Sequence, residues 1–138
     1  MYKSFYYNNS SISYLIEGTG KSVVLLHGFG EDSSIFNHQI NYLKNYCQLI
    51  VPDLPGSGKS ELLISNKEYL TSSIQHPASI VDYANCIYAL LQHENITSCT
   101  MIGHSMGGYI TLEFAKLFPN ALSAFGLFHS TAFADSEE

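Results

Sequence analysis

The chain has 138 residues, of which 46% are hydrophobic and 13% charged, and its formal net charge is −6. This length and hydrophobic content are typical of one globular domain and exclude a chain that is disordered by composition. The acidic balance and the six scattered lysines argue against a nucleic-acid-binding surface and against a basic patch for a membrane surface.

The cysteines and the hydropathy pattern bear on the compartment. Cys47, Cys86 and Cys99 form no C-x-x-C pair, and a sparse, odd count favours reduced thiols over a disulfide framework. No apolar run approaches the roughly 18 residues of a membrane span. The first residues also lack an apolar signal region. We therefore expect a cytoplasmic protein without membrane contact.

The first third of the chain predicts a hairpin, a buried strand and a helix. Aromatic or β-branched residues fill 5–7 and 12–17, and Asn8-Asn9-Ser10 between them favours a turn. Residues 23–26 form a short continuous apolar run, typical of a strand that is buried on both faces of a parallel sheet. A helix is then expected from the spacing of Phe36, Ile40 and Leu43 behind the capping candidates Asp32 and Ser33.

The rest of the chain continues the alternation of strands and helices. The expected elements are a strand over 49–51, mostly loop over 53–77, a helix over 80–91 after a Ser79–Asp82 capping box, a strand over 99–102, a helix over 110–117 that ends before Pro119, and a strand over 122–129. Such an alternation predicts an α/β fold, a doubly wound and mostly parallel sheet with an N-terminal antiparallel hairpin. Functional groups in these folds gather at the carboxyl ends of the strands.

The sequence Gly103-His104-Ser105-Met106-Gly107 follows the third predicted parallel strand and opens a helix. It is a G-x-S-x-G pattern in the strand-turn-helix context that the motif requires. A sharp turn there exposes the serine side chain, and small neighbours, including Gly108, make room for it. The helix N-terminus offers free N–H groups to a developing oxyanion. We expect Ser105 to be a nucleophile with a positive φ angle.

The sequence His27-Gly28-Phe29-Gly30 follows the first predicted parallel strand. Its two glycines allow the backbone to turn an N–H toward the same edge of the sheet, where the motif's second oxyanion donor lies. We assign the oxyanion hole to the backbone N–H groups of Phe29 and Met106. The Ser105 hydroxyl is expected to face the same crevice as the Phe29 amide. His27 and His104 are interpreted as shaping the site rather than ionising in catalysis.

With the block Asp53-Leu54-Pro55-Gly56-Ser57-Gly58-Lys59-Ser60, these two motifs resemble the N-terminal part of an α/β-hydrolase fold serine hydrolase of the esterase and lipase kind. The resemblance implies that the block from Asp53 to Ser60 shapes a loop after a strand and does not contact the substrate. A phosphate-loop interpretation of the same block is disfavoured, because Asp53 stands where that loop needs glycine and Pro55 lacks an amide hydrogen. An aspartate-nucleophile dehalogenase or epoxide hydrolase is disfavoured, because the nucleophile position holds serine.

The resemblance also implies parts that the sequence does not supply. In this fold the triad acid and the histidine base follow the nucleophile in that order, whereas the only histidine after Ser105 is His129, and every later loop acid follows it. We therefore expect both the triad acid and the base to be absent. Residues 1–138 are interpreted as the N-terminal part of one domain, truncated before its cap and last strands, with the cap region beginning within 130–138 and Asp135 at a cap helix rather than in a triad.

Three hypotheses on function remain open. The first is a serine hydrolase that acts, in its complete form, on ester or related acyl bonds of a small-molecule substrate. The second is a non-catalytic protein that binds a small ligand on the same fold, and the third is an inert fragment. We expect no cofactor and no metal, since no histidine or cysteine pair has ligand spacing. His38, His76 and His93 are expected to be exposed, and the apolar edge strand over 122–129 is expected to drive self-association.

Overall fold

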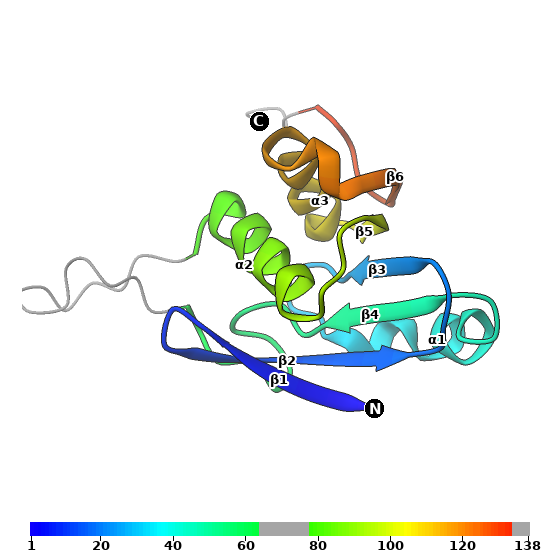
Figure 1. The fold of residues 1–138 in the computed structure, drawn as a ribbon. Coiled ribbons are helices and arrows are strands. Elements are labelled where there is room, and N and C mark those ends of the chain that lie inside the picture. The colour runs from blue at the N-terminus through cyan, green and yellow to red at the C-terminus, as the bar shows by residue number, and fades with distance from the viewer. Residues whose placement is uncertain (64–77, 134–138) are drawn as a thin grey trace, which may run out of the picture.

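The computed structural model describes residues 1–63 and 78–133 (Figure 1). The elements within these residues are β1 (Tyr2–Tyr7), β2 (Ser10–Glu17), β3 (Ser22–Leu26), the 3₁₀ helix η1 (Ser33–Phe36), α1 (Asn37–Leu43), β4 (Gln48–Pro52), α2 (Ile80–His93), β5 (Cys99–His104), α3 (Met106–Leu117), the 3₁₀ helix η2 (Pro119–Ala121) and β6 (Leu122–Phe128). The predicted order of strands and helices is confirmed.

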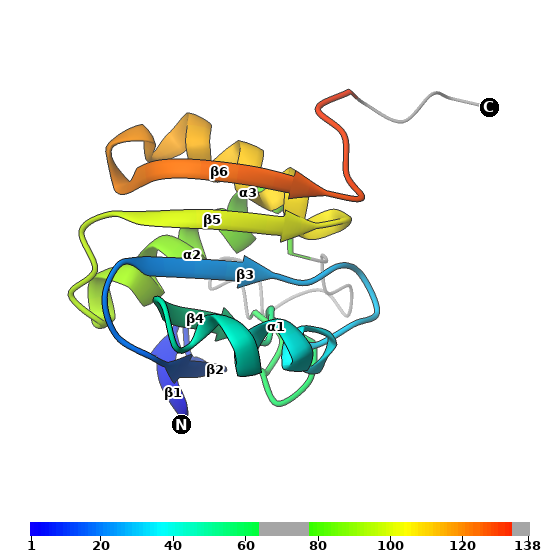
Figure 2. The same cartoon turned by 90° about the vertical axis from the view of Figure 1, so that its right-hand side faces the viewer.

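The strands form one mixed sheet in the order β1-β2-β4-β3-β5-β6 (Figure 2). β3 pairs in parallel with β4 on one side and with β5 on the other, and β5 pairs in parallel with β6. β1 and β2 form the antiparallel hairpin, whose second strand joins the sheet by antiparallel pairing with β4. The two strands that carry the candidate motifs, β3 and β5, are therefore neighbours at the centre of the sheet.

Helices cover both faces of the sheet (Figures 1 and 2). α2 and α3 pack over one face, where the larger apolar core includes Ile87, Leu91 and Phe114. α1 packs over the other face, where a smaller core includes Ile40 and Leu49. The doubly wound α/β architecture is confirmed.

Local signals explain where the helices begin. The Ser79 hydroxyl accepts a hydrogen bond from the Asp82 N–H, and the Asp82 carboxylate accepts one from the Ser79 N–H, so the capping box of α2 is present. Asp32 caps η1 by accepting a hydrogen bond from the Ser34 N–H. α3 ends at Leu117, just before Phe118 and Pro119, as the proline predicts.

Two expectations need comment. His129 was expected to end the last strand, but β6 ends at Phe128, because His129 has a φ of +49° that a strand does not accommodate. Residues 53–63 form the expected loop. The remainder of the predicted loop, His76, and the suspected cap helix at Asp135 lie outside the described residues.

Candidate functional site

Ser105 lies at the turn between β5, which ends at His104, and α3, which begins at Met106. Its backbone has φ 51° and ψ −119°, so the expected positive φ is confirmed. Such a conformation is costly for a residue with a side chain and is typical of functional sites. Within the described residues, the Ser105 hydroxyl makes no capping hydrogen bond to α3. The side chain is exposed and is not used to stabilise the helix.

Glycines let the chain approach itself closely around this turn. A Cβ atom on Gly103 would lie 2.1 Å from the carbonyl oxygen of Gly107, and one on Gly107 would lie 2.3 Å from the carbonyl oxygen of Leu26. Both contacts are with backbone atoms that cannot rotate away. A Cβ atom on Gly108 would meet the Ser130 side chain instead, at 2.1 Å from its hydroxyl oxygen. The start of α3 can therefore pack directly against β5 and β3 only with glycine at Gly103 and Gly107.

The loop after β3 reaches the same turn. A Cβ atom on Gly28 would lie 3.0 Å from the Ser105 Cβ, so the backbone of this loop touches the nucleophile candidate. Gly30 has a φ of +72°, which glycine adopts without strain. The Phe29 side chain is 86% exposed. The structure thus brings together the two motifs that the sequence analysis singled out, although they are about 75 residues apart in the chain.

His27 is fully buried, and both of its ring nitrogens have partners. Its Nε2 accepts a hydrogen bond from the Leu54 N–H at 2.9 Å, and its Nδ1 lies 2.8 Å from the Gly28 carbonyl oxygen. The first contact requires an unprotonated Nε2, so the proton of the neutral ring is on Nδ1, which donates to Gly28. Both ring nitrogens of His27 are thus used, one within the loop after β3 and the other to connect this loop with the loop after β4. This is the role of a shaping residue.

Asp53 holds the loop after β4 in the same way. One carboxylate oxygen accepts a hydrogen bond from the Ser33 N–H at 2.9 Å, and the other accepts one from the Lys59 N–H at 2.9 Å. The side chain is buried, and a Cβ atom on Gly58 would collide with it. The block from Asp53 to Ser60 is therefore an ordered loop built around a buried carboxylate, which supports the interpretation that it shapes the structure.

Glu31 is not among the predicted site residues, yet its carboxylate lies at the site. Glu31 Oε2 accepts a hydrogen bond from the Gly28 N–H at 2.7 Å and lies 2.9 Å from His104 Nδ1. Burial raises the pKa of this carboxyl group, but the hydrogen bonds from Gly28 and His104 outweigh burial and lower the pKa overall. One feature of the sequence points to Glu31: an acidic residue directly after Gly30 is close enough to reach the carboxyl end of a neighbouring strand.

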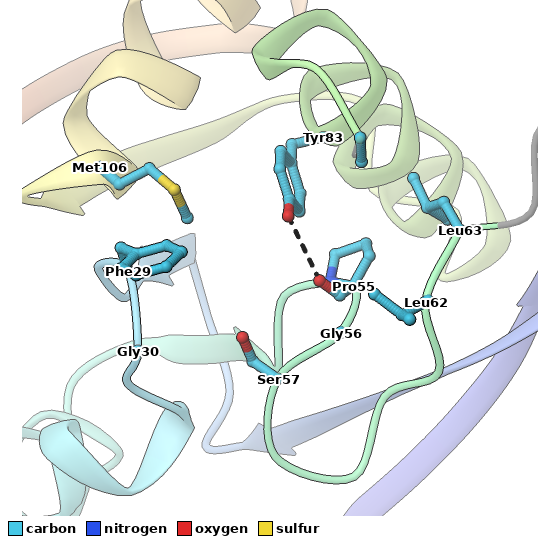
Figure 3. Close-up of a pocket in the computed structure, with 10 residues that line it drawn as sticks. Phe29, Gly30, Pro55, Gly56, Ser57, Leu62, Leu63, Tyr83 and Met106 are labelled. Atoms are coloured by element: carbon cyan, nitrogen blue, oxygen red, sulfur yellow. Dashed lines mark hydrogen bonds between the residues drawn. The ribbon is translucent and has the colours of Figure 1, made fainter. Parts of the chain in front are cut away.

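Two hollows lie near the carboxyl ends of β3 and β5. Phe29 and Met106 face one another at one end of a pocket of about 470 Å³ (Figure 3). Ser105 instead lines an open hollow of about 560 Å³ with Tyr109, His129, Ser130 and Thr131. Ser105, which lines one hollow, and Met106, which lines the other, are consecutive in the chain. The two hollows therefore meet at the start of α3.

The pocket beside Phe29 and Met106 has a mostly apolar wall with a few polar groups. Figure 3 shows the Tyr83 hydroxyl directed at the Pro55 carbonyl oxygen, to which it donates a hydrogen bond at 3.4 Å. Burial raises the pKa of the Tyr83 hydroxyl, and the negative charge of the nearby Asp82 raises it further. The full lining consists of Phe29, Gly30, Pro55, Gly56, Ser57, Leu62, Leu63, Ala78, Tyr83 and Met106.

The remaining histidines fall into two groups. His38 and His93 are exposed, as expected, and the His93 ring stacks on Phe5. His129 lies beside the site: its ring centroid is 5.9 Å from that of His104, and it lines the hollow of Ser105. Of the acids after Ser105, Glu113 pairs with Lys116 on α3. Asp135, Glu137 and Glu138 lie outside the described residues.

The described ranges are residues 1–63 and 78–133. Within them, no cluster of three or more His, Cys, Asp or Glu side chains is arranged to hold a metal ion. No helix in these ranges has the length and apolar character needed to cross a membrane.

Comparison with known proteins agrees with this geometry. The family described as alpha/beta hydrolase fold matches residues 21–133. A hydrolase of (E)-2-((N-methylformamido)methylene)succinate from Acinetobacter baylyi is 32% identical over 105 residues, which are 75% of this chain and 35% of that protein. The Karrikin insensitive 2 receptor IA of Petunia hybrida is 34% identical over 108 residues, 78% of this chain and 36% of the receptor. The solved structure of a thermophilic esterase from Thermogutta terrifontis has a TM-score of 0.81 at 29% identity, covering 92% of this chain and 43% of the esterase.

The chain spans about a third of the length of the curated relatives it matches. Within that span the family match includes both β3 and β5, the neighbouring strands whose carboxyl ends carry the two motifs. By sequence match and by fold, the chain belongs to the alpha/beta hydrolase fold family.

Proposed function

We propose that this chain carries the nucleophile-bearing part of a serine hydrolase that cleaves ester or related acyl bonds of small molecules. The observation that carries the proposal is Ser105, exposed at a strained strand-helix turn with a hydroxyl that does not cap the helix. The hydrolase and the esterase among the similar proteins support the reaction class. The three cysteines are free thiols in the described residues, which supports a cytoplasmic location.

In the proposed reaction, the Ser105 oxygen attacks the carbonyl carbon of the substrate, and its proton passes to a base. The Phe29 and Met106 N–H groups donate hydrogen bonds to the oxygen that becomes negative. Collapse of this intermediate breaks the acyl bond, releases the alcohol with a proton from the conjugate acid of the base, and leaves an acyl-serine that water hydrolyses. The triad acid and base are not assigned to residues of this chain, because the family order of acid before histidine is not met after Ser105.

A serine-reactive fluorophosphonate probe tests the nucleophile directly. We expect the probe, over prolonged incubation, to add its phosphonyl mass to the peptide that contains Ser105, with loss of fluoride; labelling should be slow because no base of this chain is assigned to activate the hydroxyl. Ser130→Ala is a matched control, because Ser130 lines the same hollow and its hydroxyl donates to the Ser105 carbonyl oxygen at 2.8 Å. Labelling should persist in Ser130→Ala and disappear in Ser105→Ala. Equal labelling of wild type and Ser105→Ala, or no labelling of either, would contradict the proposal.

Turnover by this chain alone should be very slow. Loss of the base of a serine triad costs on the order of a millionfold in turnover, and about a thousandfold acceleration over water survives from the oxyanion hole and binding. Hydrolysis of p-nitrophenyl acetate by wild type and by Ser105→Ala measures this remaining activity. A Ser105-dependent turnover of about 1 per second, an ordinary enzyme rate, would show that a base is present in the chain.

A non-catalytic small-ligand-binding protein is the second candidate. The pocket of about 470 Å³ favours it, and one of the similar proteins bears the name of a receptor. Binding of a small apolar molecule that perturbs Met106 while Ser105 resists the probe would favour this function over hydrolysis. An inert fragment would show neither response.

A further inference from the structure

One oxygen of the Glu31 carboxylate joins the two segments that form the proposed site. Glu31 Oε2 accepts a hydrogen bond from the Gly28 N–H at 2.7 Å and lies 2.9 Å from His104 Nδ1. Gly28 belongs to the loop after β3, and His104 is the last residue of β5, directly before Ser105. The same atom therefore fixes the loop that carries Phe29 relative to the turn that carries Ser105.

The charge of Glu31 determines which atom carries the proton in this contact. The side chains of Glu31 and His104 are about 31% and 21% exposed. Burial raises the pKa of the Glu31 carboxyl, but its hydrogen bonds lower the pKa by more than burial raises it. The group is therefore a carboxylate at neutral pH. A carboxylate can only accept hydrogen bonds. His104 Nδ1 must therefore hold the proton that points at Glu31, which also fixes the orientation of the ring.

These groups pack closely around Gly28. A Cβ atom there would lie 2.8 Å from Glu31 Oε2, 3.0 Å from the Ser105 Cβ and 3.4 Å from His104 Nδ1. The backbone of Gly28 thus lies close to both the Glu31 carboxylate and the Ser105 turn. Because its N–H is engaged by Glu31, Gly28 is removed from the set of oxyanion donors, and the next amide in the loop is that of Phe29.

We propose that Glu31 is a positioning residue whose carboxylate sets the loop from Gly28 to Gly30 and the His104 ring in the arrangement that makes Ser105 reactive. The effect on reactivity rests on the proposed function. The contact itself does not, and it can be measured separately. A merely stabilising surface ion pair would leave the Gly28 amide and the reactivity of Ser105 unchanged when it is removed.

Nuclear magnetic resonance of the 138-residue chain tests the contact. In wild type we expect a downfield Gly28 amide proton and a His104 ring with its proton on Nδ1. In Glu31→Ala, the amide should move upfield and the ring should lose its preference for that tautomer. Glu31→Gln keeps an acceptor oxygen and should restore part of the Gly28 shift. Glu113→Gln, which removes an ion pair on the surface of α3, should change neither signal. An unchanged Gly28 amide and His104 ring in Glu31→Ala would overturn the inference.

The rate of fluorophosphonate labelling at Ser105 tests the consequence. We expect Glu31→Ala to slow labelling about tenfold, the factor that corresponds to about 1.4 kcal/mol. Glu31→Gln should recover part of the wild-type rate. Glu113→Gln should label at the wild-type rate. Far-ultraviolet circular dichroism should show the same fold in all three variants. A wild-type rate in Glu31→Ala would overturn the positioning role while leaving the proposed function intact. Failure of wild type to label would contradict the proposed function, and the resonance data would then decide the inference.

Discussion

The Nε2 atom of His27 accepts a hydrogen bond from the Leu54 N–H at 2.9 Å and thereby ties the carboxyl end of β3 to the loop after β4. Both residues are fully buried. The bond spans 27 residues of sequence and connects the two loops whose residues line the pocket in Figure 3. Losing it would leave a buried N–H without a partner.

We expect His27→Ala to lower the free energy of unfolding by about 2–4 kcal/mol, since it orphans the Leu54 N–H and leaves a cavity. His38→Ala, at an exposed position on α1, should change it by less than about 0.5 kcal/mol. Urea unfolding followed by circular dichroism measures both values. Equal effects of the two substitutions would contradict the role assigned to His27.

The backbone of Ser105 gives a second prediction. With φ 51° and ψ −119°, the residue stores conformational strain that glycine would not. Ser105→Gly should therefore be more stable to unfolding than Ser105→Ala by about 1 kcal/mol. In the last turn of α3 the order reverses, and Ala115→Gly should cost up to about 1 kcal/mol. Thermal unfolding of the four proteins tests this, and a more stable alanine variant at position 105 would show that the turn is not strained.

The glycines of the turn give a third prediction. Gly107→Ala places a Cβ atom 2.3 Å from the Leu26 carbonyl oxygen, so α3 must move away from β3 at a cost of about 1–3 kcal/mol or more. Gly126 in β6 is the control, because its Cβ would lie in ordinary contact, 3.9 Å from Ile102 Cγ1. Gly126→Ala should leave the unfolding midpoint unchanged or raise it. A neutral Gly107→Ala variant would contradict the close approach of helix and strand.

Much of this arrangement follows from sequence patterns. The apolar run 23–26, the capping box at Ser79 and the glycine pattern around Ser105 each specify a local structure, because period, cap and turn chemistry act over a few residues. What the sequence could not predict is non-local. The antiparallel pairing of β2 with β4 depends on the whole sheet. The direction of the Glu31 side chain depends on where β5 brings His104, and no periodicity in a loop encodes it.

The direction of the Met106 side chain is not predictable from the sequence for a related reason. The motif predicts that Ser105 and the Phe29 amide lie at the same edge of the sheet, and β3 and β5 are neighbours there. It does not specify where the Met106 side chain points. In the structure this side chain faces Phe29 (Figure 3), and both residues line the same pocket.

A fourth prediction concerns pH. Burial raises the pKa of the Glu94 carboxyl, but hydrogen bonds from Tyr14 and Lys3 outweigh burial and lower it. A carboxyl whose pKa is lower in the folded than in the unfolded state stabilises the fold above the unfolded value, about 4.3, and this stabilisation is lost as pH falls through the folded value. The unfolding free energies of wild type and Glu94→Gln should therefore differ at pH 7 and converge below about pH 4. A constant difference from pH 7 to pH 3 would contradict the coupling.

The last prediction concerns the edge of the sheet. Within the described residues, β6 pairs only with β5, and its other edge is open (Figure 2). Phe125 and Phe128 are 49% and 56% exposed on this strand. An open apolar edge pairs with other chains unless charge or proline blocks it.

We therefore propose that the 138-residue chain self-associates through residues 122–129, and that light scattering after size-exclusion chromatography will show oligomers. Phe125→Lys should shift the population toward monomer, because a charge at an edge strand opposes pairing. Tyr42→Lys is the matched control, since Tyr42 is an exposed aromatic residue on α1, away from the edge, and is 64% exposed against 49% for Phe125. It should leave the association unchanged. A monodisperse wild-type species of 15.3 kDa would show that the edge does not mediate association.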